Sequence, residues 1–412
     1  MLTRGVASHV ANVRGGRPCA VIAAPSRFET EAILGALVTV AAHQTHAKKP
    51  HHKREVYIDA FRGLMALVMV QGHVFTALLS PTLQTNPLVI FQNVFHGSTA
   101  PGFLFASGFV AGLPRAPLSL HASLRRAWRL LFILGVGYFI HLPYFSFWKT
   151  LGASPVELAA LFACDALQVI ALTQLLVILL QGIAGVRWTL LAGIVALIVI
   201  VVSPWIWAGN AADHVPAALG AYLDARSGSR FPFFPFAAFV LAGTVAGAVI
   251  GRQEPHRRHR RQVIAGAGLL VGGWLLSFPL QPYVDFWGPS PAYSLMRIGG
   301  LVLLLRFVEF VADRDWPGVA ALALLGHETL QVFVLHLELL YGGVLWPAPA
   351  LSPWAGQLGL AATAAVLLAM LPILFVAAWA WHRLKMRAPR EASLLLVFVS
   401  TWFLVEYFTR PW

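Results

Sequence analysis

The chain has 412 residues, of which 58% are hydrophobic and only 11% are charged. A soluble domain carries about 25% charged residues, so this composition excludes a large soluble domain and predicts a multi-pass membrane protein in a lipid bilayer. The net charge of +13 does not indicate nucleic-acid binding. Its basic residues lie in short blocks between apolar stretches, as membrane topology requires.

The first 53 residues differ from the rest, with scattered Arg, Gly and Pro and one apolar run at 32–42. About a dozen residues cannot cross the bilayer. Acidic residues precede this run and it lies far from the N-terminus, so a signal peptide is not expected. A disordered tail, an interfacial helix and an overlong translation start all stay open; we favour a dispensable extension at 1–53 and a membrane domain at 54–412.

From Val56 onward the hydropathy pattern predicts an all-α fold with about eleven membrane-spanning helices. They are expected near 57–80, 98–113, 127–144, 157–182, 187–208, 232–251, 263–280, 292–312, 319–346, 356–381 and 392–409. Basic blocks within 48–54, 115–129, 252–261 and 383–390 then fall on one side of the membrane, which should be the cytoplasm. The N-terminus is therefore expected to be cytoplasmic, and the location the inner (cytoplasmic) membrane.

The first predicted helix carries three ionisable residues on nearly one face, Asp59, Arg62 and His73. Arg62 and His73 are eleven residues apart, which is about three turns and roughly 16 Å along the axis. Such groups are costly within a membrane unless they face a partner or a wet cavity. Arg suits a phosphate or carboxylate and His suits proton transfer. A structural Asp59–Arg62 pair, with His73 bonded to a backbone carbonyl, is the alternative.

A second polar segment, 95–108, contains His96 just before the second predicted span, on the extracytoplasmic side. Pro101 and the glycines around it allow backbone groups to face a cavity. We expect His96 to meet His73 at the outer end of the first helical hairpin, although a merely solvated His is equally compatible with the sequence. Ser107 suits close helix packing and is also a candidate substrate contact.

Further ionisable residues lie within later predicted spans. His336 and Glu338 are two residues apart and cannot share a helical face; His336 is the better candidate to face the bundle centre and contact substrate. Asp165 is a second candidate substrate contact and Arg297 a candidate for donor binding, and a buried pair between these two is left open. No closely spaced Cys/His signature is present, so no metal is expected.

Several of these motifs resemble a known family. Ile58-Asp-Ala-Phe-Arg-Gly-Leu64, followed by His73, is similar to the opening helix of transmembrane acyltransferases, and Arg62 with His73 fits the Arg-ten-His pattern of the acyltransferase-3 branch. The later motifs resemble the heparan-alpha-glucosaminide N-acetyltransferase catalytic domain and its bacterial relatives. These motifs lie at 96–108, 165–171, 231–243 and 325–336, and the resemblance covers about residues 54–345.

The resemblance implies acetyl-CoA or another acyl-CoA as a cytoplasmic donor and a glycan hydroxyl or amine as an extracytoplasmic acceptor. It implies that Arg62, with Asp59, stands near the donor and that His73 is the essential His of the acyltransferase-3 pattern. His96 resembles the extracytoplasmic His of the glucosaminide enzymes, but its spacing to Pro101 is shorter here. His73 and His96 are therefore the two candidate catalytic bases.

Two other functional classes remain open from the sequence. A transporter or export partner for a small polar or acylated solute would line its pathway with the same intramembrane polar groups. A non-catalytic scaffold in an envelope-assembly complex would have the same composition. The oligomeric state is also open, with a homodimer as one arrangement.

Overall fold

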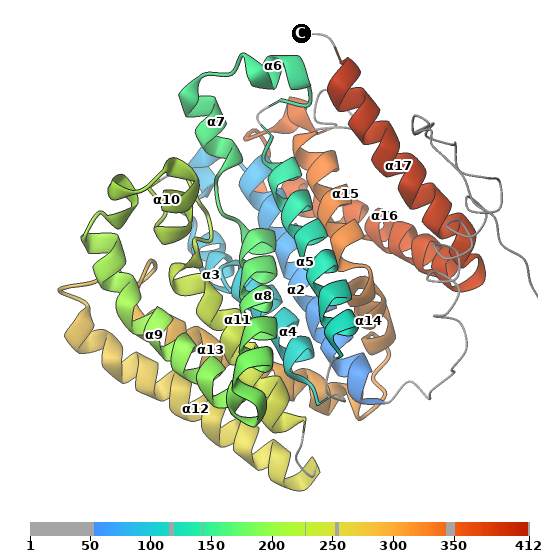
Figure 1. Cartoon of the computed structure of the whole chain (residues 1–412). Coiled ribbons are helices and arrows are strands. Elements are labelled where there is room, and N and C mark those ends of the chain that lie inside the picture. The colour runs from blue at the N-terminus through green and yellow to red at the C-terminus, as the bar shows by residue number, and fades with distance from the viewer. Residues whose placement is uncertain are drawn as a thin grey trace, which may run out of the picture. The chain divides into compact units, whose positions relative to one another are not determined.

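The computed structural model describes residues 53–114, 119–142, 144–226, 228–251, 255–342 and 351–410, and most of the expected extension lies outside them. The described residues form helices and no β-strand, apart from one isolated bridge between Leu79 and Leu358, which confirms the all-α prediction. Figure 1 shows their arrangement. In chain order the helices are α2 (Lys53–Leu78), η1 (Pro81–Leu83), α3 (Pro87–His96), α4 (Thr99–Gly112), α5 (Leu120–Ile140), α6 (Phe147–Leu151), α7 (Pro155–Leu161), α8 (Ala166–Ala184), η2 (Gly185–Arg187), α9 (Trp188–Ala208), η3 (Ala211–His214), α10 (Ala217–Leu223), α11 (Phe233–Ile250), α12 (Pro255–Leu280), α13 (Pro291–Ala312), α14 (Val319–His327), α15 (Thr329–Tyr341), η4 (Ser352–Trp354), α16 (Leu360–Arg387) and α17 (Pro389–Thr409).

Among the described residues, fewer helices than the eleven expected have the length and composition of a membrane span. By length and composition, six helices of the described chain can cross a membrane, or seven if the bent pair α14–α15 is one span. Each expected segment does fall on a helix, but α4 has only 14 residues and is too short for a 30 Å core. The helices α5 and α13 each contain three charged residues. The segment Ala166–Ala208, which overlaps two of the expected spans, is counted as a single apolar stretch.

Two of the expected spans are interrupted at polar residues, and in the first of them these residues cap helices. The segment 157–182 divides into α7, which begins with a capping box between Ser154 and Glu157, and α8, which is capped by Asp165. A side chain that satisfies free backbone N–H groups makes such a helix start favourable. The segment 319–346 bends by 80° at Glu328, between α14 and α15.

Helix α2 lies within the bundle and packs against α4, α13, α14, α15 and α16. Its crossing with α14 depends on Gly63 and Gly326, because a Cβ on either would lie within 1.9 Å of a backbone oxygen of the other helix. The crossing of α4 and α11 is similar: at Gly108, Gly112, Gly243 and Gly247, a Cβ would lie 1.9 to 2.1 Å from a backbone oxygen. Such small residues allow helix backbones to approach closely in membranes.

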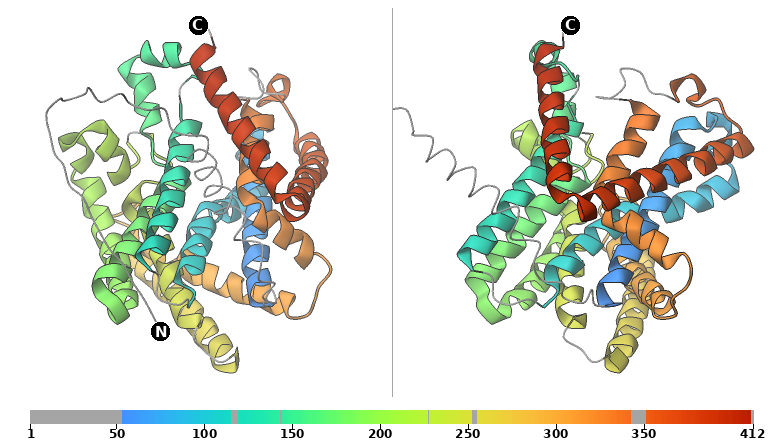
Figure 2. Two further views of the ribbon diagram at one scale, coloured as in Figure 1. Left: turned by 45° about the vertical axis from the view of Figure 1, so that its right-hand side comes forward. Right: turned by 90° about the vertical axis from the view of Figure 1, so that its right-hand side faces the viewer.

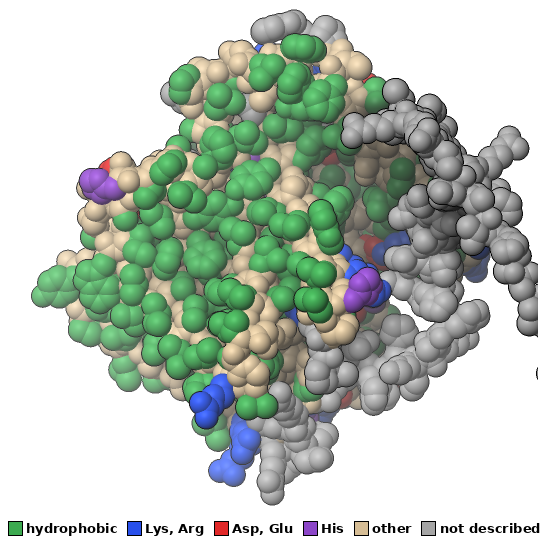
Figure 3. All heavy atoms as spheres, viewed as in Figure 1, with side chains coloured by type: hydrophobic (Ala, Val, Ile, Leu, Met, Phe, Trp, Pro, Cys, Tyr) green, Lys and Arg blue, Asp and Glu red, His purple; other side chains and the backbone are tan. Residues whose placement is uncertain are grey.

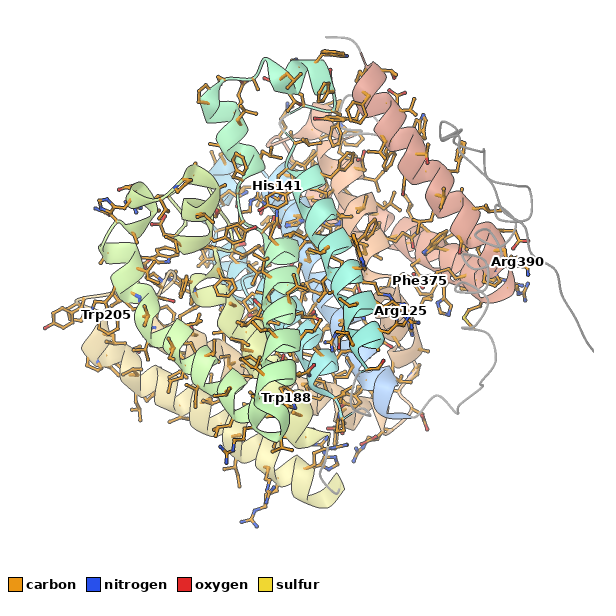
Figure 4. All side chains as sticks on the ribbon, viewed as in Figure 1. Arg125, His141, Trp188, Trp205, Phe375 and Arg390 are labelled. Carbon is orange, nitrogen blue, oxygen red and sulfur yellow. The ribbon has the colours of Figure 1, made fainter. Side chains whose placement is uncertain are left out.

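The outer surface of the bundle suits lipid. One face is covered mainly by hydrophobic side chains, and the few Lys and Arg side chains in view lie at its lower edge and toward its right-hand side (Figure 3). Trp188 and Trp205 lie at opposite ends of α9 on this face (Figure 4), as aromatic residues do at the two membrane interfaces. At the other side, α16 and α17 meet at Ala388 at a sharp angle (Figure 2).

Candidate functional site

Three histidines from three helices meet near the C-terminal end of α2. Nδ1 of His73 on α2 lies 2.7 Å from Nε2 of His336 on α15, and the planes of the two rings differ by 19°. The ring of His96, the last residue of α3, lies 5.5 Å from the ring of His73, centroid to centroid. The sequence placed His73 and His96 at one end of the first hairpin, and the structure brings His336 to the same point.

The three side chains differ in their surroundings. His336 is fully buried, and its Nδ1 lies 2.9 Å from the carbonyl oxygen of Val332, one turn earlier in α15. His73 and His96 are partly exposed. His336 is therefore enclosed, whereas part of the surface of His73 and of His96 stays exposed.

The position of His96 depends on a glycine. Gly72 precedes His73, and a Cβ on Gly72 would lie 1.7 Å from Nδ1 of His96. The same nitrogen lies 3.4 Å from the carbonyl oxygen of Val68. Burial of the ring lowers the pKa of His96, so this imidazole is neutral near pH 7 and can accept a proton.

The turn between α3 and α4 is fixed by α13. Arg297 donates a hydrogen bond to the carbonyl oxygen of Val94 (2.9 Å) and another to Oγ of Ser98. The hydroxyl of Tyr293 donates to the carbonyl oxygen of Gly97 at 3.4 Å. Arg297, a candidate for donor binding from the sequence, therefore contacts the backbone beside His96 and belongs to the histidine end of the site.

A second polar cluster surrounds the break between α14 and α15. Arg62 donates to Oγ1 of Thr329 (2.9 Å) and lies 3.4 Å from Oδ1 of Asp59. Nε2 of His327 lies 3.3 Å from the other oxygen of Asp59. Since Arg62 and His73 both turn toward α14–α15, the expectation that they share a face of α2 is consistent with the contacts.

The same break also carries Glu328, which is buried and contacts a lysine and a histidine of α16. Its carboxylate accepts hydrogen bonds from Nζ of Lys385 (2.7 Å) and Nδ1 of His382 (2.9 Å). The cluster thus joins α2, α14, α15 and α16 through polar contacts around two carboxylates, Asp59 and Glu328. This arrangement satisfies the buried carboxylate, as a low-dielectric site requires.

The remaining candidate residues lie elsewhere. Asp165 accepts the backbone N–H of Ala166 and faces His141, with 3.6 Å between Oδ2 and Nε2; His141 marks the upper end of α5 in Figure 4. The buried Asp165–Arg297 pair that the sequence left open does not form among the described residues, because each side chain has these other partners. Oγ of Ser107 accepts a hydrogen bond from Nε2 of Gln174 of α8, and its role as a substrate contact stays a prediction.

Sequence reasoning missed several residues of the two clusters. Gly72 makes room for His96, but a glycine within an apolar helix carries no sign of such a role. Thr329 has no distinguishing pattern either. His382 and Lys385 lie in a basic block that we interpreted only as a topology signal, and only the fold brings them to Glu328.

The histidine cluster does not have the arrangement of a metal centre. Among the described residues, no group of three or more His, Cys, Asp or Glu side chains is placed to hold a metal ion. Direct contact between two ring nitrogens, as in His73 and His336, leaves no space for an ion between them. The geometry is that of a hydrogen-bonded relay.

Comparison with known proteins identifies the family. The family model described as "Heparan-alpha-glucosaminide N-acetyltransferase, catalytic" matches residues 54–278, more than half of the chain. The match includes α2, His73 and His96 and ends before His336. No curated protein matches the chain. The match supports a membrane enzyme of the acetyltransferase type, and the chain belongs to the family of the heparan-alpha-glucosaminide N-acetyltransferase catalytic domain.

Proposed function

We propose that this protein transfers an acetyl or short acyl group from acyl-CoA, supplied on the cytoplasmic side, to a hydroxyl or amine of an extracytoplasmic glycan. The observation that carries the proposal is the pair of polar clusters along α2, one at Arg62 and one at His73. They are about 16 Å apart, which separates a donor end from an acceptor end. Family membership supports the acyl-transfer chemistry.

The acceptor end supplies the base. His73 or His96 removes the proton from the acceptor hydroxyl or amine as its oxygen or nitrogen attacks the thioester carbonyl. The C–S bond then breaks, and the imidazolium returns its proton to the departing CoA sulfur. In an alternative mechanism, the histidine attacks the thioester first, so that CoA leaves and an acyl-imidazole forms. The acceptor then takes the acyl group from the imidazole.

The donor end supplies charge. Arg62 is the candidate to hold a phosphate of CoA, because a guanidinium presents several N–H donors in one plane. Its present partners, Asp59 and Thr329, keep that group at the break between α14 and α15. We therefore expect Arg62→Ala to raise the KM for acyl-CoA more than it lowers kcat.

The test is transfer of label from radiolabelled acetyl-CoA into glycan enclosed in inside-out membrane vesicles. His73→Ala and His96→Ala are compared with wild type and with His214→Ala, a matched control because His214 is exposed in η3, outside both clusters. We expect label in the wild type and the control and a loss of at least about 100-fold in one or both cluster variants.

Two results would overturn the proposal. Transfer at the wild-type rate in both cluster variants would remove the histidines from the chemistry. No transfer from acetyl-CoA or from longer acyl-CoAs, together with uptake or efflux of a solute independent of CoA, would favour a transporter. The location of the label, on enclosed glycan or on external material, reports the side on which the acceptor binds.

A further inference from the structure

The hydrogen bonds of His336 assign a proton to one of its nitrogens. Nδ1 lies 2.9 Å from the carbonyl oxygen of Val332. A carbonyl oxygen can only accept, so Nδ1 carries the hydrogen of this bond. A neutral imidazole has one N–H, and Nε2 of His336 is therefore an acceptor.

This assignment extends to His73. Its Nδ1 lies 2.7 Å from Nε2 of His336, and the ring centroids are 5.0 Å apart. That centroid separation equals the N···N distance plus the radius of each ring, so the two nitrogens point directly at each other, as an N–H···N bond requires. Because Nε2 of His336 accepts, Nδ1 of His73 donates, and Nε2 of His73 keeps its lone pair.

We propose that His336 is a positioning residue that fixes the tautomer of His73 and leaves Nε2 of His73 as the proton acceptor of the transfer reaction. The inference rests on the proposed function and deepens it, because it selects one nitrogen of one histidine as the base. A base oriented by a third group is the usual arrangement around an activated nucleophile. His336 itself is fully buried with both nitrogens engaged, so it is not a substrate contact.

The relay makes the reaction depend on two protonations. Protonated His336 cannot accept the bond from His73, and protonated His73 cannot act as a base. The other titratable or charged groups near His73 are His96 of α3 and Arg230, which precedes α11. As the pH is lowered, kcat/KM should therefore fall with a slope that corresponds to the binding of more than one proton.

Two substitutions separate positioning from simple packing. Gln at position 336 can place its Oε1 near the site of Nε2 and accept from His73, whereas Leu fills similar space and accepts nothing. We expect H336Q to keep kcat within about tenfold of wild type, with an acid limb that corresponds to one proton. H336L should lose at least about 100-fold in kcat with little change in the KM for acetyl-CoA, since a wrong tautomer removes the base.

The tautomer can be measured without catalysis. Solid-state ¹⁵N NMR of histidine-labelled protein in nanodiscs, with H73Q as the difference reference, should show His73 protonated at Nδ1 in wild type and in H336Q. H336L should show a mixture of tautomers. Melting temperatures of the variants control for folding.

The outcomes separate the two proposals. The inference is overturned if NMR shows that His73 is protonated at Nε2 in the wild type. It is also overturned if H336L keeps the wild-type kcat. The third contrary result is an H336Q variant that is as inactive as H336L although its melting temperature is unchanged. Absence of acyl transfer in a wild-type protein that shows the expected tautomer overturns the proposed function and, with it, the assignment of Nε2 as the catalytic base, while the hydrogen-bonded relay itself stands.

Discussion

Replacement of Gly72 by Ala tests the geometry of the histidine cluster with a single methyl group. The new Cβ would lie 1.7 Å from Nδ1 of His96, whereas ordinary contact begins at 3.4 Å, so the ring must move by about 1.7 Å. His96 is partly exposed and lies at the end of a short helix, so the ring can move without disrupting the core. The His96 ring lies beside the ring of His73, and a misplacement of about 1 Å can cost about 100-fold in rate even when the change lies outside the reacting group itself.

We therefore expect Gly72→Ala to lower kcat for acyl transfer by about 100-fold and to change the melting temperature little. The assay is label transfer from acetyl-CoA, with differential scanning fluorimetry of the purified protein in detergent. Gly268→Ala is the matched control, because a Cβ on Gly268 of α12 meets no atom within 4 Å. If Gly72→Ala retains wild-type kcat while folded, the contact between α2 and His96 is not part of the site.

Three further predictions concern packing, the turn at His96 and the segment 144–161. Gly243→Val should lower the melting temperature, because its Cβ would lie 2.0 Å from a carbonyl oxygen of α4 and overpacking costs about 1–3 kcal/mol or more. Arg297→Leu removes the bond to Ser98 and should lower kcat by about tenfold without changing the KM for acyl-CoA. The Tyr144 hydroxyl holds the pKa of Glu157 at about 2, below its ordinary value of 4.5, so their contact is complete above pH 4.5 and is lost as pH falls toward 2. Hydrogen exchange of residues 144–161 should therefore rise over that interval in wild type and show no such step in Glu157→Gln.

Each of these results has a clear counter-result. A melting temperature unchanged by Gly243→Val would mean that α4 and α11 are not in close contact. An unchanged kcat in Arg297→Leu would leave the turn at His96 independent of α13. Equal exchange profiles in wild type and Glu157→Gln would show that the carboxylate does not stabilise the segment 144–161.

The helices were predictable because their signal is local. Hydropathy alone located the eleven apolar segments, and all of them contain helix. The two interruptions were also present in the sequence: Ser154-Pro-x-Glu157 is a capping-box pattern, and Asp165 precedes an apolar run. An average over about 19 residues passes over such short polar signals, which is why 157–182 was expected as one span.

The candidate site was only partly predictable, because its contacts join distant segments. The spacing of Arg62 and His73 on one helix can be read from the sequence, but the bond between His73 and His336 spans 263 positions. Arginine is a residue type that often binds phosphate, yet the actual partners of Arg297 are groups beside His96, including the carbonyl oxygen of Val94. No pattern within α13 distinguishes these two uses of a guanidinium.

Two contacts on either side of the bend between α14 and α15 align α15 with α2. Gly63 and Gly326 touch at the crossing of α2 with α14, and His73 and His336 touch ten residues further along both chains. The two paths therefore contain the same number of residues, although the path from Gly326 to His336 includes the 80° bend at Glu328. An inserted residue in either path would turn its histidine by about 100° around the helix axis. We therefore expect an insertion or deletion between these contacts to separate His73 from His336, even where single substitutions are tolerated.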